Sequence, residues 1–168
     1  MAVMWPRQLP PWIVSDSRRV AERHVFAKLK DVLDNDWVVF YSRPWWGIAR
    51  GGGEVDGEAD FIVAHPGFGL LFLEVKGGGI SFNPENGQWQ TKDRYGITHN
   101  IKNPVSQAMT CKHRYLERLR RLKEWPKNFI RFRHGVVFPD SAAPSEDCLS
   151  LDGHDLNLFC FSDTLEEA

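Results

Sequence analysis

Apolar positions recur in two segments of the chain with the period of an amphipathic helix. The first pattern predicts a helix that begins after Ser15 or Ser17, either of which can serve as its N-cap, and that ends at about Leu33. A second helix, with Asn103 as its N-cap, is predicted to run to about Leu122. Its inward face would consist of Ala108, Cys111, Tyr115, Leu119 and Leu122.

Strand-sized runs of β-branched and aromatic residues lie between and after these helices. They cover residues 37–42, 58–64, 70–76, 129–138 and 156–161, and a small β excursion is expected between residues 80 and 98. Residues 43–57 contain a Pro and several Gly and are predicted to form a flexible loop. The order helix, strand, strand, strand, helix, strand predicts a central mixed sheet flanked by helices, in the α/β or α+β class.

The length and composition indicate one globular domain. A chain of 168 residues is long enough to bury its own core, and 42% hydrophobic residues with seven Trp and eleven Phe exclude a disordered or fibrous protein. We expect residues 1–14 to form an N-terminal lead and residues 15–162 the domain. Residues 163–168 would begin a linker to a missing C-terminal region.

The cysteines and the apolar runs bear on the compartment. Cys111, Cys148 and Cys160 are odd in number and far apart, which argues against both a disulfide framework and a zinc site. The N-terminus lacks the pattern of a signal peptide, and no stretch approaches the roughly 18–20 apolar residues that span a bilayer. A cytoplasmic protein without membrane contacts is therefore expected.

Two carboxylates meet if the second and third strands form a hairpin closed by residues 65–69. Counting outward from this turn places Asp60 opposite Glu74. Because side chains alternate between the two faces of a strand, Lys76 shares a face with Glu74, and Glu58 would lie across from Lys76.

Opposed like charges destabilise a sheet, so this pair indicates a bound cation. Oxygen ligands at a site open to water favour Mg²⁺ or Mn²⁺ over zinc. Lys76 could orient a metal-bound water or help to deprotonate it for attack on phosphorus, which predicts phosphodiester hydrolysis. An isolated Glu-x-Lys at a strand end is usually a solvated edge. The opposed Asp60 and the following glycines Gly77–Gly79, which would admit a phosphate backbone, favour the site.

The same residues carry a resemblance to a known family. Asp60 and, on the next strand, Glu74-Val-Lys76 resemble the PD-(D/E)xK nuclease signature, although Ala59 stands where that signature has Pro. With the later Asn103-Pro-Val-Ser-Gln107, the segment from about Ser17 to Phe138 resembles the NERD (nuclease-related) domain. The resemblance implies an α/β restriction-endonuclease-like core and roles in DNA processing, often beside helicase or kinase domains in longer chains.

These arguments select a set of site residues. The expected catalytic residues are Asp60, Glu74, Lys76 and Gln107, and the expected metal ligands are Asp60, Glu74, Val75 and Glu22. Glu22 shares a helix face with apolar residues, and similar nucleases often supply a first-helix Glu as an extra ligand; the alternative is a solvated edge of that face. Gln107 resembles the family's helix Gln near the catalytic centre, and it lies one position beyond the capping-box site.

Basic residues concentrate between Lys102 and Arg133, although the net charge is −1. They and the Gly-rich loop supply the expected nucleic-acid contacts, which are Arg43, Arg50, Lys102, Lys112, Arg114 and Arg118. Trp45 and Trp46 could stack on bases. The alternatives are a solvated helix face and Trp side chains that pack down a loop.

The resulting hypothesis is a nuclease that depends on Mg²⁺ or Mn²⁺ and acts on DNA, in DNA processing or defence, with a fused or associated helicase or NTPase as candidate partner. One alternative is a catalytically silent module that binds or targets nucleic acid within a larger protein. Another is a structural domain that binds a protein partner, which salt-independent binding would indicate. The complete set of Asp, Glu and Lys argues against lost catalysis.

Overall fold

A mixed sheet forms the centre of the fold. The computed structural model describes residues 1–48, 52–145 and 150–167. Within them, six strands pair in the order β1-β2-β3-β4-β8-β11. Their bounds are Val3–Trp5, Val38–Ile48, Glu54–His65, Gly69–Val75, Phe132–Phe138 and Phe159–Phe161. The strands β2, β3 and β4 are antiparallel, whereas β4 pairs in parallel with β8, so the predicted mixed sheet is confirmed.

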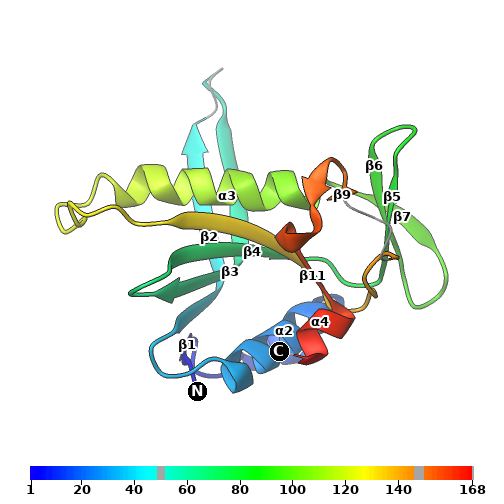
Figure 1. Cartoon of the computed structure of the whole chain (residues 1–168), viewed down its shortest axis with the longest axis horizontal. Helices are drawn as coiled ribbons and strands as arrows, with labels where there is room; N and C mark the ends of the chain where they lie inside the picture. The colour runs from blue at the N-terminus through cyan, green and yellow to red at the C-terminus, as the bar shows by residue number, and fades with distance from the viewer. Residues whose placement is uncertain (49–51, 146–149, 168) are drawn as a thin grey trace.

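Helices cover both faces of this sheet (Figure 1). The helix α3 (Pro104–Leu119) crosses one face, and α2 (Val20–Val32) and α4 (Ser162–Glu167) lie on the other. Phe61 is fully buried between the sheet and α2, and Phe72 is buried on the α3 side beside Cys111. Both apolar faces of the strands are thus covered, as a three-layer arrangement requires. No helix in the described residues is long and apolar enough to cross a membrane.

The predicted first helix is present, but it begins differently. The helix α2 follows a 3₁₀ turn, η1 (Ser17–Arg19), and the cap of that turn is Asp16, whose side chain accepts from the Arg18 backbone N–H at 2.9 Å. Ser15 ends a short helix, α1 (Pro11–Ser15), that the prediction lacked. The predicted serine caps are therefore wrong, because the Asp16 carboxylate takes the free N–H group.

The segment 43–57, predicted to be a flexible loop, is mostly strand. The strands β2 and β3 pair as far as Ile48 and Glu54, and they project beyond α3 (Figure 1). Trp45 lies opposite Gly57, and a Cβ atom at Gly57 would lie 2.6 Å from the Trp45 ring. The glycines that suggested a loop therefore include one that makes room for an aromatic side chain across the ladder.

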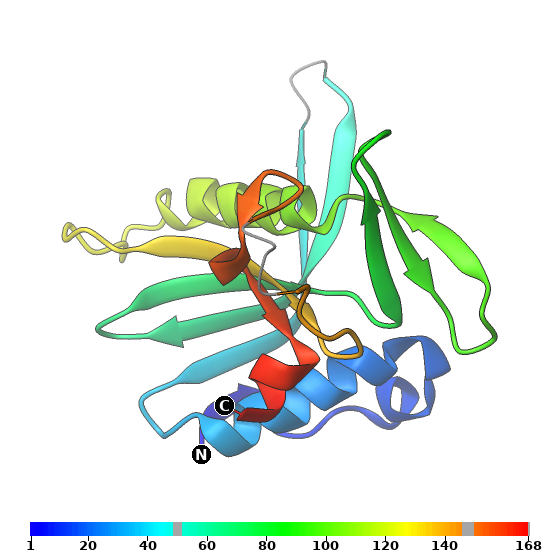
Figure 2. The same ribbon diagram turned by 45° about the vertical axis from the view of Figure 1, so that its right-hand side comes forward.

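The expected β excursion is a separate sheet beside the main one (Figure 2). It consists of β5 (Gly79–Asn83), β6 (Gln88–Lys92) and β7 (Thr98–Ile101). Trp89 is 1% exposed and joins this sheet to a second core with Phe138 and Phe159. Between β8 and β11 the chain forms the short strands β9 (Ser150–Leu151) and β10 (His154–Asp155) and the turn η2 (Leu156–Leu158).

Asn103 ties the start of α3 to this second core. Its side chain accepts from the Ser106 backbone N–H at 3.0 Å, as predicted for an N-cap, and donates to Asp152 at 2.6 Å. Replacing Asn103 with Ala is expected to lower the free energy of unfolding by about 1–2 kcal/mol, because the cap and the part-buried hydrogen bond to Asp152 are both lost. Urea denaturation measures this change. The exposed Asn128→Ala is the control and should stay within about 0.5 kcal/mol of the wild type.

Candidate functional site

Asp60 and Glu74 lie side by side where the pairing of the central strands is interrupted. The predicted register is confirmed, since Ala64 pairs with Leu70 and Ile62 with Phe72. The ladder between β3 and β4 ends one step before Asp60, whose Oδ2 accepts instead from the Val75 backbone N–H at 2.7 Å. The Asp60 carboxylate is thereby held against the end of β4.

The partner of Asp60 in the ladder with β2 is also missing. Pairing passes from Tyr41–Phe61 to Arg43–Ala59, and Ser42 between them has a φ of 53°. Non-glycine residues rarely adopt this left-handed conformation, and such strain often accompanies functional sites. Asp60 therefore has no ladder partner on either neighbouring strand, β2 or β4.

Burial and mutual repulsion oppose ionisation of the two carboxyl groups. Glu74 is 4% exposed, and Lys76 Nζ lies 2.6 Å from its Oε1. Burial, followed by the charge of Glu74, raises the pKa of Asp60 to about 8, although the Val75 N–H opposes the shift. Burial also raises the pKa of Glu74, against the pull of Lys76. The Lys76 ammonium next to Glu74 therefore does not compensate the charge of both carboxylates.

Glu22 and Glu58 extend the acidic cluster toward α2. Glu22 Oε2 accepts from the Tyr41 hydroxyl at 2.6 Å and from Arg19 Nη1 at 2.9 Å. Glu58 accepts from Ser42 Oγ and lies 3.4 Å from Arg19 Nη1, so it does not pair with Lys76. The charge of Glu22 raises the pKa of both Asp60 and Glu74, which places Glu22 near the pair.

The donor set fits a hard divalent cation. Two carboxylates at the end of adjacent strands are oxygen ligands of the kind that Mg²⁺ and Mn²⁺ prefer. Positive charge next to Asp60 would offset the burial and the charge of Glu74 that raise its pKa. In the described parts of the chain, no group of three His, Cys, Asp or Glu side chains is arranged to hold a metal ion. Glu22 is turned to Tyr41 and Arg19, so the carboxylates facing such an ion are Asp60 and Glu74.

A family comparison adds an independent finding. The model of the family described as the nuclease-related domain, NERD, matches residues 17–139. The chain belongs to the NERD family. The matched range contains Glu22, Asp60, Glu74, Lys76 and Gln107, and the resemblance proposed from the sequence is confirmed. No curated protein and no solved structure shows a significant match to the chain.

Gln107 of this NERD domain lines a polar hollow next to the carboxylates. The hollow has a volume of about 310 Å³ and is lined by Trp45, Asp56, Gly57, Glu58, Lys102, Asn103, Ser106, Gln107 and Thr110. Gln107 Oε1 and Trp45 Nε1 are buried and have no hydrogen-bond partner among the described residues. The structure therefore brings Gln107 to the Glu58 side of the site, within a surface that the sequence did not predict.

The predicted nucleic-acid contacts have different surroundings in the structure. Lys102 lies at the polar hollow, and Arg118 lies 5.5 Å from the centre of the exposed Trp46 ring on the β2–β3 hairpin. Lys112 turns instead to His134 Nδ1 at 3.1 Å, and Arg43 packs against Phe40. Arg114 Nη1 interacts with Glu117 at 3.5 Å and lies against Gly47 of β2, where an added Cβ atom would be 3.4 Å from it. Arg50 lies outside the described residues.

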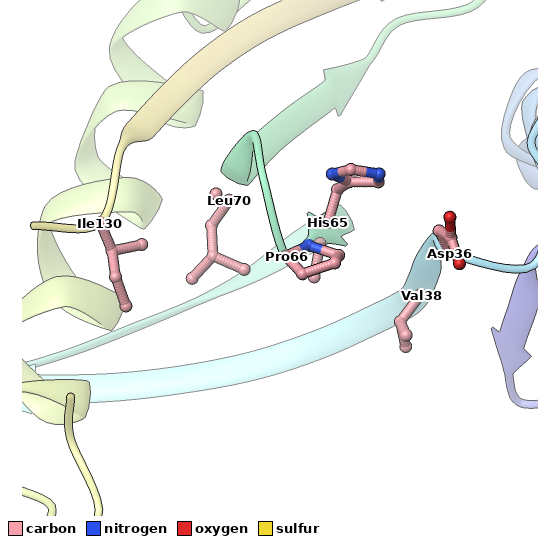
Figure 3. A pocket seen from close by; sticks show the side chains of 8 residues that line it. Asp36, Val38, His65, Pro66, Leu70 and Ile130 are labelled. Atoms are coloured by element: carbon pink, nitrogen blue, oxygen red, sulfur yellow. The ribbon is translucent and has the colours of Figure 1, made fainter. Parts of the chain in front are cut away.

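A second hollow, of about 360 Å³, lies at the turn between β3 and β4 (Figure 3). Leu70, Pro66 and Ile130 give it a largely apolar wall. It lies at the turn end of β4, whereas Glu74 lies near the other end of that strand. None of the predicted site residues lines it.

Arg19, Tyr41 and Ser42 are site residues that the sequence analysis missed. They hold Glu22 and Glu58 through hydrogen bonds between α2, β2 and β3. No local pattern marks them, because Arg19 resembles any basic residue at a helix start and Tyr41 any aromatic residue in a strand. Of these three residues, only Ser42 could have been noticed from the sequence, because it is a small polar residue that interrupts an apolar strand.

Proposed function

We propose that this NERD domain is a divalent-metal-dependent nuclease that hydrolyses phosphodiester bonds of DNA. The observation that carries the proposal is the pair Asp60 and Glu74, which lie side by side next to Lys76, with Glu74 buried and Asp60 partly buried. Buried carboxylates with strongly shifted pKa values are typical of functional sites. The NERD assignment supports a nuclease-related role.

Asp60 and Glu74 would hold the cation, Mg²⁺ or Mn²⁺, with the main-chain carbonyl of Val75 as a third ligand, because the Val75 side chain is buried in the core. A bound divalent cation stabilises negative charge on phosphoryl oxygens and makes a nearby water more acidic. Glu22 would act through its charge, held in place by Tyr41 and Arg19.

Lys76 would position the attacking water. Its ammonium is held by Glu74 in the absence of a cation, and a cation at Glu74 would release Nζ from that contact. The free ammonium could then donate a hydrogen bond to the water and stabilise charge that develops on the phosphate. Gln107 and Lys102, on the Glu58 side, would position the substrate.

A calorimetric titration with Mn²⁺ and Mg²⁺, paired with cleavage of plasmid and single-stranded DNA, tests the proposal. We expect the wild type to bind one cation and to cut DNA, and Asp60→Ala and Glu74→Ala to lose at least about tenfold in affinity, since one carboxylate of two is removed. The exposed Glu124→Ala serves as the matched control and should retain both activities. A wild type that binds neither ion and leaves DNA intact would show that the proposal is wrong.

A further inference from the structure

The polar hollow beside Glu58 contains a hydrogen-bond donor that nothing in the described residues satisfies. Trp45 is 8% exposed, and its Nε1 is buried without a partner. The ring lies against Gly57 so closely that any side chain there would displace it. Buried indole N–H groups usually have a partner, and an exception calls for an explanation.

An unsatisfied acceptor lies in the same hollow. Gln107 Oε1 is also buried without a partner in the described part of the chain. Asn103 already caps α3 through Ser106, so Gln107 has no capping task. Ser106 and Thr110 line the hollow from the same helix, one and three positions away. The hollow is therefore lined by a residue of β2 with an unpaired donor and a residue of α3 with an unpaired acceptor.

The charges around the hollow disfavour a phosphate as its occupant. Asp56 and Glu58 line it from β3, and their carboxylates would repel an anion. Lys102 also lines the hollow, and its exposed side chain could contact a phosphate outside the hollow. The acceptors on Asp56, Glu58 and Gln107 instead suit amino groups. An occupant that is neutral and carries both an amino group and an acceptor satisfies all of these groups.

We propose that this hollow binds the base of a nucleotide next to the scissile phosphate, with Trp45 Nε1 donating to the base and Gln107 Oε1 accepting from its amino group. A volume of about 310 Å³ admits one base, and reading the edge of an unstacked base in such a pocket is an established mode of recognition. Because Glu58 lines the hollow and lies two positions from Asp60 on β3, a base held here brings its phosphodiester to the carboxylate pair.

The acceptors predict which bases bind. Cytosine, adenine and guanine carry an exocyclic amino group, and thymine does not. Thymine offers a single ring N–H where an amino group offers two N–H donors, so a site with Gln107 Oε1 and two carboxylates should prefer deoxycytidine to thymidine by about tenfold, as one well-formed base contact provides. The proposal rests on the proposed function only in taking DNA as the substrate.

Titration of metal-free, ¹⁵N-labelled protein with deoxycytidine, thymidine and deoxyribose 5-phosphate tests it by NMR. The Trp45 indole N–H resonance, assigned through Trp45→Phe, should shift and saturate with deoxycytidine, shift about tenfold less readily with thymidine, and stay in place with the sugar phosphate. Gln107→Leu should abolish the difference between the nucleosides, whereas the exposed Gln8→Leu should keep it. Thermal melting of each variant checks that it is folded.

The outcomes separate this proposal from the nuclease itself. A Trp45 resonance that stays in place up to the solubility limit of deoxycytidine, or that moves equally with the sugar phosphate, overturns the base site even if the wild type cuts DNA. A selective shift of this resonance supports the base site even if no DNA is cut, because the titration contains no metal and needs no cleavage.

Discussion

Lys76→Met is expected to lower the rate of DNA cleavage by about 10²–10⁴, the usual loss when a group that positions a nucleophile or stabilises developing charge is removed. Methionine retains the length of the side chain and loses the ammonium that lies 2.6 Å from Glu74 Oε1. Cation affinity should be kept or raised, because Lys76 and the cation compete for the same carboxylate. Single-turnover cleavage and calorimetry on one sample measure both quantities.

Lys30→Met, in the last turn of α2, is the matched control for this prediction. It removes an ammonium from the other end of the helix that carries Glu22 and should leave the cleavage rate unchanged. If Lys76→Met cuts DNA as fast as the wild type, Lys76 has no part in the reaction. If it loses cation binding together with cleavage, its role is to hold Glu74 and not to position the water.

Asp60→Asn is expected to stabilise the metal-free protein at alkaline pH. Burial and the charge of Glu74 raise the pKa of Asp60 in the folded state to about 8, from 3.8 in the unfolded chain. At this position the folded protein therefore binds more protons than the unfolded chain between these values, and the contribution of Asp60 to the free energy of unfolding falls as the pH rises from about 4 to about 8. An amide does not ionise and can still accept from the Val75 N–H, so the variant escapes this loss.

At pH 8 to 9 the variant should exceed the wild type by about 1–3 kcal/mol in the free energy of unfolding, given that one pKa unit corresponds to about 1.4 kcal/mol and that the structure relaxes around the charge. At pH 4 the two should be equal. Urea denaturation across this range measures the difference, and Asp31→Asn, at an exposed position of α2, should follow the wild type. A difference between the variant and the wild type that does not grow between pH 4 and 8 would contradict the prediction.

Mg²⁺ provides the complementary measurement. A cation that binds only the folded protein adds about 2.7 kcal/mol at a concentration of 100 times its Kd. It should raise the melting temperature of the wild type at pH 8 and have little effect on Asp60→Asn. Such a gain would show that the acidic pair trades stability for cation binding, a common arrangement in catalytic sites.

Local sequence predicted the elements that carry the carboxylate pair. The hairpin of β3 and β4 has a short connection, so its register follows from counting residues outward from the turn, and Asp60 and Glu74 come together at its open end. The helices α2 and α3 were also predicted, because their apolar residues recur with the helical period.

The prediction from sequence was wrong where it rested on the content of Pro and Gly and not on a periodic pattern of apolar residues. Residues 43–57 contain the Pro and Gly of a loop, and yet β2 and β3 extend through most of them, because pairing between the strands outweighs the weak strand propensity of each residue. The strand β1 is three residues long and joins β2 only because the chain before α1 folds back to the sheet. A segment that short leaves no periodic signal.

The sequence by itself determined the pairing of Asp60 with Glu74, the neighbouring Lys76 and the α/β class, because each depends on alternation or period over a few residues. Tertiary structure alone decided which partners surround that pair. Glu22 turned to Tyr41 and Arg19, and Trp45 and Gln107 came to face one hollow from β2 and α3. These contacts join residues far apart in the chain, and such contacts depend on how whole elements pack, which no local pattern encodes.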